Sequence, residues 1–469
     1  MRAILKCSVL VWTLAAPAMA LVELRTDPLE PSALGARWDG LAGVPPLRTG
    51  DNLRLWAGWD GQDPTMMASC VTELDARLSL DLLVVGMKGE DVKTRLGSSR
   101  QRDDLSGRVM RGLVRYQGSK LDFEFGRDRP ANWTQGVDHP ALRNTVLPVD
   151  LARLTFKSPR YGLEVGSQLV SLPTPKRRSG FRRWMNGHRL TWVHGAWEVE
   201  LGDWILYTGQ NRGIEPAYLN PLIPSFVGTF EQIPQADSLS RYDNDNNLMC
   251  ASVTWATKGA PTTWRVRLDV VVDEFQIDSA DRSRMDDVLG VRMVAGTRST
   301  RETGTWQGAL SISALSSWLY QHPGNETDWS AYDASLGHAA GGDLLEAVAG
   351  LAWRPNSRPR GQRVALWTEG CGVALEGGVR HKGAIVLADP WNPERTSGQS
   401  MPTSPLGRIH WLTGDLLMGW NVGAHGVMQT GALLRWFDAP GKQENGFDLQ
   451  LVLRLGLMWD ESPAPLKAN

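Results

Sequence analysis

The chain has 469 residues, of which 42% are hydrophobic and 22% charged, and its 50 Lys and Arg balance 51 Asp and Glu to a formal net charge of -1. This balance offers no electrostatic case for nucleic-acid binding. After residue 20 no run of about 18 uninterrupted apolar residues occurs, so we expect no transmembrane helix. A chain of this kind can cross a membrane only as a closed β-barrel.

The N-terminal residues have the pattern of a secretory signal peptide. Arg2 and Lys6 flank the start of a mostly apolar run at 7–16, and a small-x-small cleavage site follows at 18–20. We find no composition break that would divide the rest into separate domains. The predicted division is a signal peptide at 1–20, a short N-terminal periplasmic segment at 21–50, a barrel at 51–460 and a C-terminal tail at 461–469.

Apolar and polar residues alternate along much of the chain from about residue 70 to residue 459. This period of two is typical of a strand with two different faces. The clearest example puts five apolar residues on one face: Trp264, Val266, Leu268, Val270 and Val272. A soluble sandwich would bury that face, whereas a membrane barrel turns it toward lipid. We therefore expect Arg265, Arg267 and Asp269, on the opposite face, to line a polar lumen.

The last strand and the connections favour the membrane barrel. Between Phe447 and Trp459, seven apolar residues fall on one face, which exceeds an ordinary strand and matches a membrane crossing. Short turns are expected at 117–120, 158–161 and 194–195, alternating with long connections, as in barrels with short periplasmic turns and longer outer loops. The predicted fold is all-β: a transmembrane antiparallel β-barrel of roughly 16 to 18 strands with long extracellular loops.

Tryptophan and cysteine usage leave alternatives open. The 21 Trp outnumber the 9 Phe and 7 Tyr. Such rings collect in the interfacial girdles of barrels, which is the preferred interpretation, and they also stack on sugars. After signal removal three cysteines remain, Cys70, Cys250 and Cys371. In the oxidising periplasm they could form one disulfide or stay unpaired and buried.

One segment carries a resemblance to a known family. Residues 208–224 read TGQNRGIEPAYLNPLIP, and residues 243–249 read DNDNNLM, after strands containing HRLTW at 188–192 and LGDWILY at 201–207. This pattern resembles the Wzi capsule-assembly family over about residues 185–275. The resemblance implies an outer-membrane barrel that binds exported polysaccharide at the cell surface and helps to anchor the capsule. It implies a lectin and not an enzyme.

The loop at 208–224 supplies candidate site residues that have two interpretations. Glu215, Tyr218 and Asn220 can bind sugar hydroxyls, with the tyrosine ring as a stacking platform. Alternatively, the prolines fix a loop that folds inward, and Tyr218 and Leu222 pack it into the barrel so that it narrows the lumen. We favour the packed constriction, although the two roles are compatible.

The acidic stretch that follows has a spacing that resembles the start of a calcium loop. Asp243, Asp245 and Asn247 stand at alternate positions. However, Leu248 occupies the place that needs Gly, and Thr254 the place that needs Glu. We therefore expect these side chains to bind loop amides, and we group Asp243 and Asn247 with the polysaccharide-binding or lumen-constricting site.

The strongest local charge cluster lies in a predicted outer loop. Its members are Lys176, Arg177, Arg178, Arg182 and Arg183. These cations can hold an acidic polysaccharide by charge-assisted hydrogen bonds. They can equally contact lipopolysaccharide phosphates or form a solvated face.

Catalytic and metal-binding patterns are not found in the sequence. No G-x-S-x-G is present, and the 8 His lack metal spacing. We expect no enzyme activity, metal or cofactor. The expected partners are outer-membrane lipid and lipopolysaccharide, surface polysaccharide and the barrel assembly machinery, with no nucleic acid. A porin for small polar or carbohydrate solutes is the second hypothesis, because the expected lumen is charged.

Overall fold

The computed structural model describes most of the strands and a part of the connections. The described residues are 54–59, 64–88, 101–102, 105–130, 139–142, 148–174, 180–223, 225, 245–257, 262–273, 288–316, 319–320, 329–331, 334–338, 342, 344–354, 366–381, 408–422, 426–438 and 446–457. The predicted signal peptide, the periplasmic segment at 21–50, Trp459 and the tail at 461–469 lie outside them.

Strands dominate the described chain, and each apolar and polar alternation noted above falls in one of them. The first strands are β1 (Arg54–Trp59), β2 (Pro64–Glu73), β3 (Leu78–Lys88), β4 (Gln101–Arg102), β5 (Leu105–Gln117), β6 (Leu121–Asp128), β7 (Val149–Ser158), β8 (Leu163–Leu172), β9 (Phe181–His194) and β10 (Trp197–Gln210). They are followed by the 3-10 helix η1 (Pro216–Leu219), β11 (Asp245–Ala256), β12 (Thr262–Asp273), β13 (Val288–Arg301), β14 (Gly304–Leu315), β15 (Ser330–Ala331), β16 (Ala334–Ser335), β17 (Leu344–Arg354), β18 (Leu366–His381), β19 (Arg408–Val422), β20 (Gly426–Asp438) and β21 (Gly446–Leu457).

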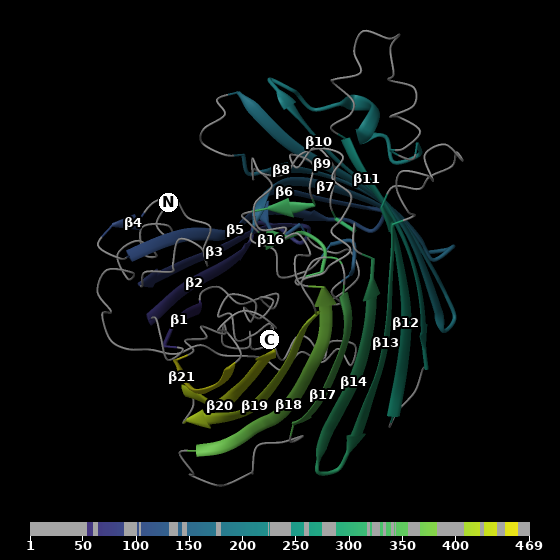
Figure 1. The fold of residues 1–469 in the computed structure, drawn as a ribbon. Coiled ribbons are helices and arrows are strands. Elements are labelled where there is room, and N and C mark those ends of the chain that lie inside the picture. Colours follow the sequence, from purple (N-terminus) through teal and green to yellow (C-terminus); the bar gives the residue numbers. More distant parts are fainter. Residues whose placement is uncertain are drawn as a thin grey trace.

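The strands form a meander that curls into a barrel (Figure 1). Within the described residues one sheet has 19 strands, in which each long strand pairs antiparallel with its neighbours in sequence, while β15 and β16 form a separate small sheet. β21 lies beside β1, so the first and last strands of the meander come together. The prediction of an all-β antiparallel barrel is confirmed. No helix in the described chain is both long and apolar enough to span a membrane.

The two faces of the wall have opposite chemistry, as the alternation predicts. We call the face with exposed apolar side chains the outward face. On β12 it carries Trp264, Val266 and Leu268, which are 51%, 37% and 45% exposed, while Arg267 and Asp269 on the other face are fully buried. Outward tryptophans gather near the short turns: Trp192, Trp197, Trp255, Trp264, Trp306 and Trp353. Their arrangement matches an interfacial girdle.

The short turns occur where the sequence predicts them, and backbone hydrogen bonds connect neighbouring turns. β5 and β6, β7 and β8, and β9 and β10 are joined by tight connections. Backbone bonds then link successive turns, because Lys157 donates to the carbonyl of Lys120 and Val193 donates to the carbonyl of Gly162. These turns lie at one end of the barrel, and the longer connections after β6, β8 and β10 leave from the other end.

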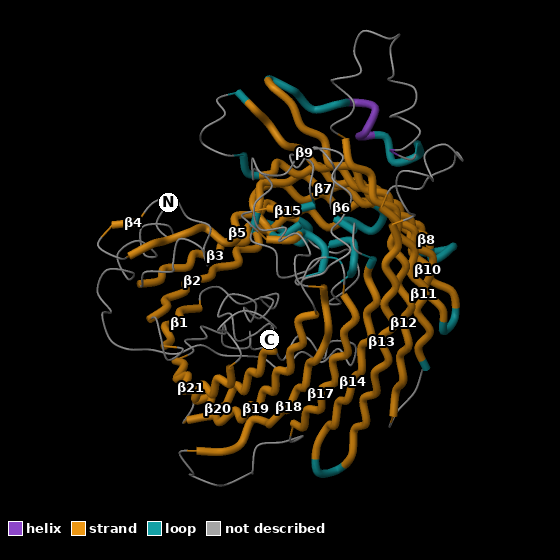
Figure 2. Tube along the Cα trace, viewed as in Figure 1, coloured by secondary structure: helices purple, strands orange, loops and turns teal. Residues whose placement is uncertain are grey.

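Two of the longer connections fold into the lumen, and together we call them the lumen plug: residues 139–142, between β6 and β7, and the described residues of 319–338, between β14 and β17. Figure 2 shows these loops and β15 inside the ring of strands. The Tyr320 hydroxyl donates to the Pro140 carbonyl, and the Trp329 indole N–H donates to the Ala141 carbonyl at 2.6 Å. Both loops bury apolar side chains against Trp204, Leu206 and other inward residues near the long-loop end. This apolar layer packs the plug against the inward face of the wall near that end.

Candidate functional site

The loop that carries the family resemblance is fixed by a buried ion pair. We call residues 211–223 together with Ser225 the outer flap. Both terminal guanidinium nitrogens of Arg212 donate to the carboxylate of Asp245, at the start of β11, with Nη2 to Oδ2 at 2.8 Å. The Nε of Arg212 donates to Glu215 at 3.2 Å. Arg212 and Asp245 are 2% and 1% exposed in their side chains, so water hardly screens the pair. The guanidinium also lies over the Tyr207 ring, 4.9 Å from its centre.

Tyr218 closes this cluster from the 3-10 helix. Its hydroxyl donates to Asp245 at 2.9 Å, and its backbone carbonyl accepts the Asn186 side-chain amide at 2.8 Å. Its ring packs on that of Tyr207 with centres 5.1 Å apart. Burial and the neighbouring Asp245 raise the pKa of Tyr218 above its ordinary value, so the phenol stays protonated and keeps donating. Tyr218 is fully buried, which leaves its ring no surface on which a sugar can stack.

The outer flap lies on the outward face of the wall, which differs from the expected lumen constriction. Asn186, Tyr207 and Asp245 share a face, because Ile205 pairs with Asn186 and Tyr207 pairs with Asp245. The same face of β10 continues to Leu201, which is 51% exposed. Thus Tyr218 packs on the outside of β9 and β10, and the carbonyl of Leu219 accepts from Ser167 on the outward face of β8. Our expectation that this loop folds into the lumen is wrong. Its turn residues fix the shape of the loop, but they do not determine which face of the wall the loop covers.

The other predicted residues of this loop have varied positions. Glu215 is half-buried against Arg212, whereas Asn220 is exposed and its Oδ1 accepts the Leu222 amide at 3.1 Å. Asn247 lies on the outward face of β11, opposite Ile205. Asp243 lies outside the described residues. Asp245, within the calcium-like spacing, has both carboxylate oxygens engaged by Arg212.

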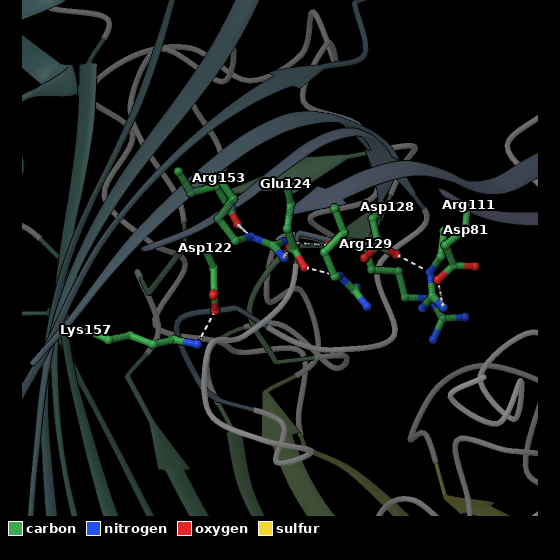
Figure 3. A network of polar contacts seen from close by, with 10 residues as sticks. Asp81, Arg111, Asp122, Glu124, Asp128, Arg129, Arg153 and Lys157 are labelled. Atoms are coloured by element: carbon green, nitrogen blue, oxygen red, sulfur yellow. Dashed lines mark hydrogen bonds and ion pairs between the residues drawn. The ribbon is translucent and has the colours of Figure 1, made fainter. Parts of the chain in front are cut away.

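The inward face of the wall carries a network of alternating charges below the apolar layer (Figure 3). Arg111 on β5 bridges Asp81 and Asp128 at 3.1 Å each, and Lys157 on β7 meets Asp122 on β6. Glu124 accepts from both Arg115, at 2.6 Å, and Arg153. The carboxylates therefore already have cationic partners within the wall, so the network presents no single uncompensated sign.

The network continues across β8 to β12, where the three predicted lumen residues lie. Arg189 reaches Glu164 at 3.3 Å and Glu200 at 3.6 Å, and Arg267 pairs with Asp269 and lies 4.0 Å from Glu200. Arg265 is less buried and approaches Glu198 at 3.9 Å. A cavity of about 10 Å³ lies here against the lumen plug, which is the room of about one water molecule. No sugar fits in a cavity of this size.

His139 fastens the lumen plug to the charged wall. Its Nδ1 accepts the Ala141 amide at 2.9 Å, and its Nε2 lies 2.9 Å from the Ser252 hydroxyl, which donates to Asp269 at 2.7 Å. Burial lowers the pKa of His139 to about 4, so the ring is neutral and Nε2 carries its proton. In a Ser-His-Asp triad the carboxylate orients the histidine through Nδ1. Here a backbone amide occupies Nδ1 and all three side chains are buried, so the trio acts as a clip.

Two members of the predicted basic loop belong to a strand. Arg182 and Arg183 lie in β9, which begins at Phe181, so they are not part of the outer loop in which we expected them. Arg182 is exposed, whereas Arg183 is 2% exposed on the inward face. Lys176, Arg177 and Arg178 lie outside the described residues. Adjacent residues of a strand point to opposite faces, so Arg182 and Arg183 lie on different sides of the wall. Their common charge did not predict this separation.

The described cysteines are free thiols. Cys70 on β2 is half-buried, and Cys250 on β11 is buried at the apolar layer beside Gly202. The side chain of Cys371 is not among those that the structure describes. The sequence also missed Arg212, Asn186 and His139 as organising residues. An arginine beside an E-P turn and ahead of an acidic stretch was the available signal for Arg212. The side-chain partner of His139, Ser252, is 113 residues away and leaves no local pattern.

Comparisons with known proteins show the fold. No protein-family model matches the chain, and no curated protein matches it. Among solved structures it is similar to Wzi, a carbohydrate-binding outer-membrane β-barrel involved in group 1 capsule assembly in Escherichia coli, with 10% identity, a TM-score of 0.56, and coverage of 95% of this chain and 100% of that one. It is also similar to a BenF-like porin from Pseudomonas fluorescens (11% identity, TM-score 0.47, coverage 87% and 98%) and to OpdK from Pseudomonas aeruginosa (12%, 0.46, 87% and 97%). The predicted resemblance to Wzi is confirmed in the fold.

Proposed function

We propose that this chain is an outer-membrane barrel that binds exported or capsular polysaccharide at the cell surface, as a lectin and without catalysis. The observation that carries the proposal is the likeness to the carbohydrate-binding barrel Wzi, which extends over 95% of this chain and all of that one. The short-turn end faces the periplasm and the long loops face outward, as in other barrels of this class. Without the 2-residue β4, the 19-stranded described sheet corresponds to a barrel of 18 strands.

The lumen plug favours surface binding over passage through the barrel. Its apolar side chains pack on inward residues of the wall near the long-loop end, and a cavity between the plug and Glu200 has a volume of about 10 Å³. A ligand as large as a polysaccharide is therefore met at the loops and not in the lumen. The candidate contacts are the basic residues Lys176, Arg177, Arg178 and Arg182 at that end, which suit an acidic glycan.

Glycan binding by the purified protein tests this function. The probe is the acidic capsular or exopolysaccharide of the host, immobilised on a sensor surface, with the protein in detergent micelles. Replacing Lys176, Arg177, Arg178 and Arg182 with Ser is expected to weaken retention strongly and to increase its salt sensitivity. A matched control replaces Lys120 and Arg160, which are exposed cations in the short turns. Equal loss in both variants, or no retention of the unchanged protein, contradicts the proposal.

A porin for small polar or carbohydrate solutes is the second candidate, and the charged inward wall favours it. Arg111, Arg115, Arg153 and Arg267 line that wall with their acidic partners. Conductance in planar bilayers separates the two functions. A steady open channel in the unchanged protein supports the porin, whereas a closed barrel that still retains glycan supports the surface-binding function.

A further inference from the structure

The outer flap covers wall that a membrane would otherwise contact. A tilted strand crosses the hydrocarbon layer in about 9–11 residues. Counted from Trp197, at the short-turn end of β10, this length reaches residues 205–207. Tyr218 packs against Ile205 and Tyr207, and the Ser225 amide donates to Asp203. The flap therefore overlies the last part of the strand that lies within the apolar band.

The wall beneath the flap is polar where lipid would require apolar side chains. Asn186, His188, Asp203, Asp245 and Asn247 all face outward on β9, β10 and β11. Charged groups on the lipid face of a barrel cost free energy that increases with depth. The flap lowers this cost for three of the five, because Asp245 binds Arg212 and Tyr218, Asp203 accepts the Ser225 amide, and Asn186 donates to the Tyr218 carbonyl.

The free side of the flap is largely apolar, as we expect if the flap takes the place of the wall. Its exposed large apolar side chains are Ile214 at 44%, Leu219 at 38%, Leu222 at 81% and Ile223 at 37%, and the exposed polar side chains among them are Asn211 and Asn220. The uncovered wall of the same strand has a comparable value, with Leu201 at 51%. The apolar surface of the wall thus continues over the flap. The lipid that contacts Leu201 on the wall is therefore also expected to contact the flap.

We propose that the outer flap is immersed in the outer leaflet and binds lipid acyl chains through Ile214, Leu219, Leu222 and Ile223. The inference rests on the proposed membrane location. It assigns the E-P-x-Y-L-N-P segment to lipid contact, in place of contact with polysaccharide. Arg212, Tyr218 and Asp245 form the anchor that holds the flap against the wall.

A nitroxide spin label at position 222 tests the immersion directly. Leu222→Cys is labelled in a Cys70→Ser/Cys371→Ser background, since the thiol of Cys250 is buried. The protein is reconstituted into phosphatidylcholine vesicles, and collisions with oxygen and with a water-soluble nickel chelate are compared. Leu201→Cys provides the lipid reference and Ser119→Cys, in a short turn, the water reference. The ratio of oxygen to nickel accessibility at 222 is expected within about twofold of that at 201.

The references keep the two proposals distinguishable. A lipid-like ratio at 201 with a water-like ratio at 222 overturns the immersed flap and leaves the barrel in the membrane. A water-like ratio at 201 overturns both.

A second variant measures the consequence for membrane insertion. Leu222→Asp is expected to slow folding into vesicles severalfold, because a carboxylate then enters the apolar band, and to leave folding in detergent micelles unchanged. Leu74→Asp is the matched control, since Leu74 is 60% exposed in a short turn. Equal insertion rates for Leu222→Asp and Leu74→Asp overturn the inference.

Discussion

The outer flap and the lumen plug leave the same end of the barrel and fold onto opposite faces of the same strands. On β10 the inward residues Trp204 and Leu206 pack with the plug, and the outward residues Ile205 and Tyr207 pack with the flap. The plug brings apolar side chains to an apolar layer and adds polar contacts to the wall through His139, the Tyr320 amide and His338. The flap brings a charged anchor to a polar patch and shows an apolar surface to its surroundings.

This difference shows that a loop is fixed by the wall it meets and not by the end from which it leaves. The outward face of β9 to β11 has buried polar groups, so its cover must supply hydrogen-bond donors and a cation. The inward face near the long-loop end is apolar, so its cover must supply side chains that fill space. The two covers therefore depend on different interactions, and they can be disrupted separately.

The largest effect is expected from removing the cation of the flap anchor. Arg212→Met leaves Asp245 buried without its partner, which typically costs about 3–5 kcal/mol. Urea unfolding of the vesicle-inserted protein measures the loss. Arg127→Met is the matched control, because its pair with the 61% exposed side chain of Asp150 is worth about 0–1 kcal/mol. The double variant Arg212→Met/Asp245→Leu should recover most of the loss, and an Arg212→Met protein as stable as the control argues against the anchor.

The clip of the lumen plug should give the next effect, and on a different measurement. His139→Leu removes the contacts to Ser252 and Ala141, which are worth about 1–3 kcal/mol when buried groups lose their partner. Channel conductance in planar bilayers is expected to rise while the flap stays in place. His194→Leu, at an exposed histidine stacked on Trp192, should leave conductance unchanged. Unchanged conductance in both variants means that His139 does not hold the plug.

The same histidine makes the plug sensitive to acid. The pKa of His139 is lowered to about 4 by burial, against an ordinary 6.5 once the loop is released. Between pH 6.5 and 4, His139 is therefore protonated in the released state and neutral in the closed state. The free energy that favours the closed state falls by about 1.4 kcal/mol for each unit by which the pH drops in this range. The charged groups that face His139 are Asp269, Arg267 and Arg292. Conductance should rise as the pH falls through this window, and His139→Leu should abolish that dependence.

The smallest effect is expected where the flap loses one hydrogen bond and keeps its ion pair. Tyr218→Phe removes the hydroxyl that donates to Asp245, at a cost of about 0.5–1.5 kcal/mol. Urea unfolding compares it with Tyr161→Phe, whose ring is 65% exposed in a short turn. A loss as large as that in Arg212→Met would mean that the phenol, and not the guanidinium, is the main anchor.

The sequence predicts the wall well because alternation is a local property. Trp264 to Asp269 and the short turns follow from period and turn chemistry alone, and both agree with the structure. The flap's direction could not be predicted in this way, yet two irregularities pointed to it. Trp204-Ile205-Leu206-Tyr207 is apolar on both faces, and Asn186 and His188 are polar on the outward face. Each breaks the alternation where the wall is covered.

The remaining unpredicted features depend on contacts between distant parts of the chain. His139 meets Ser252, and Tyr320 meets Pro140, only because the sheet curls and brings β6, β11 and β14 around one lumen. The sequence shows that Arg267 and Asp269 face away from lipid, but it does not show that they pair with each other beside a histidine from another loop.

The separation in sequence between bonded residues gives the barrel an order of assembly. Tyr218 lies 27 residues from Asp245, so the flap can close as soon as β9, β10 and β11 have paired. Trp329 lies 188 residues from Ala141, and that bond must wait until β14 has joined the sheet. Because distant contacts close more slowly than near ones, we expect the outer flap to pack on the wall before the lumen plug does.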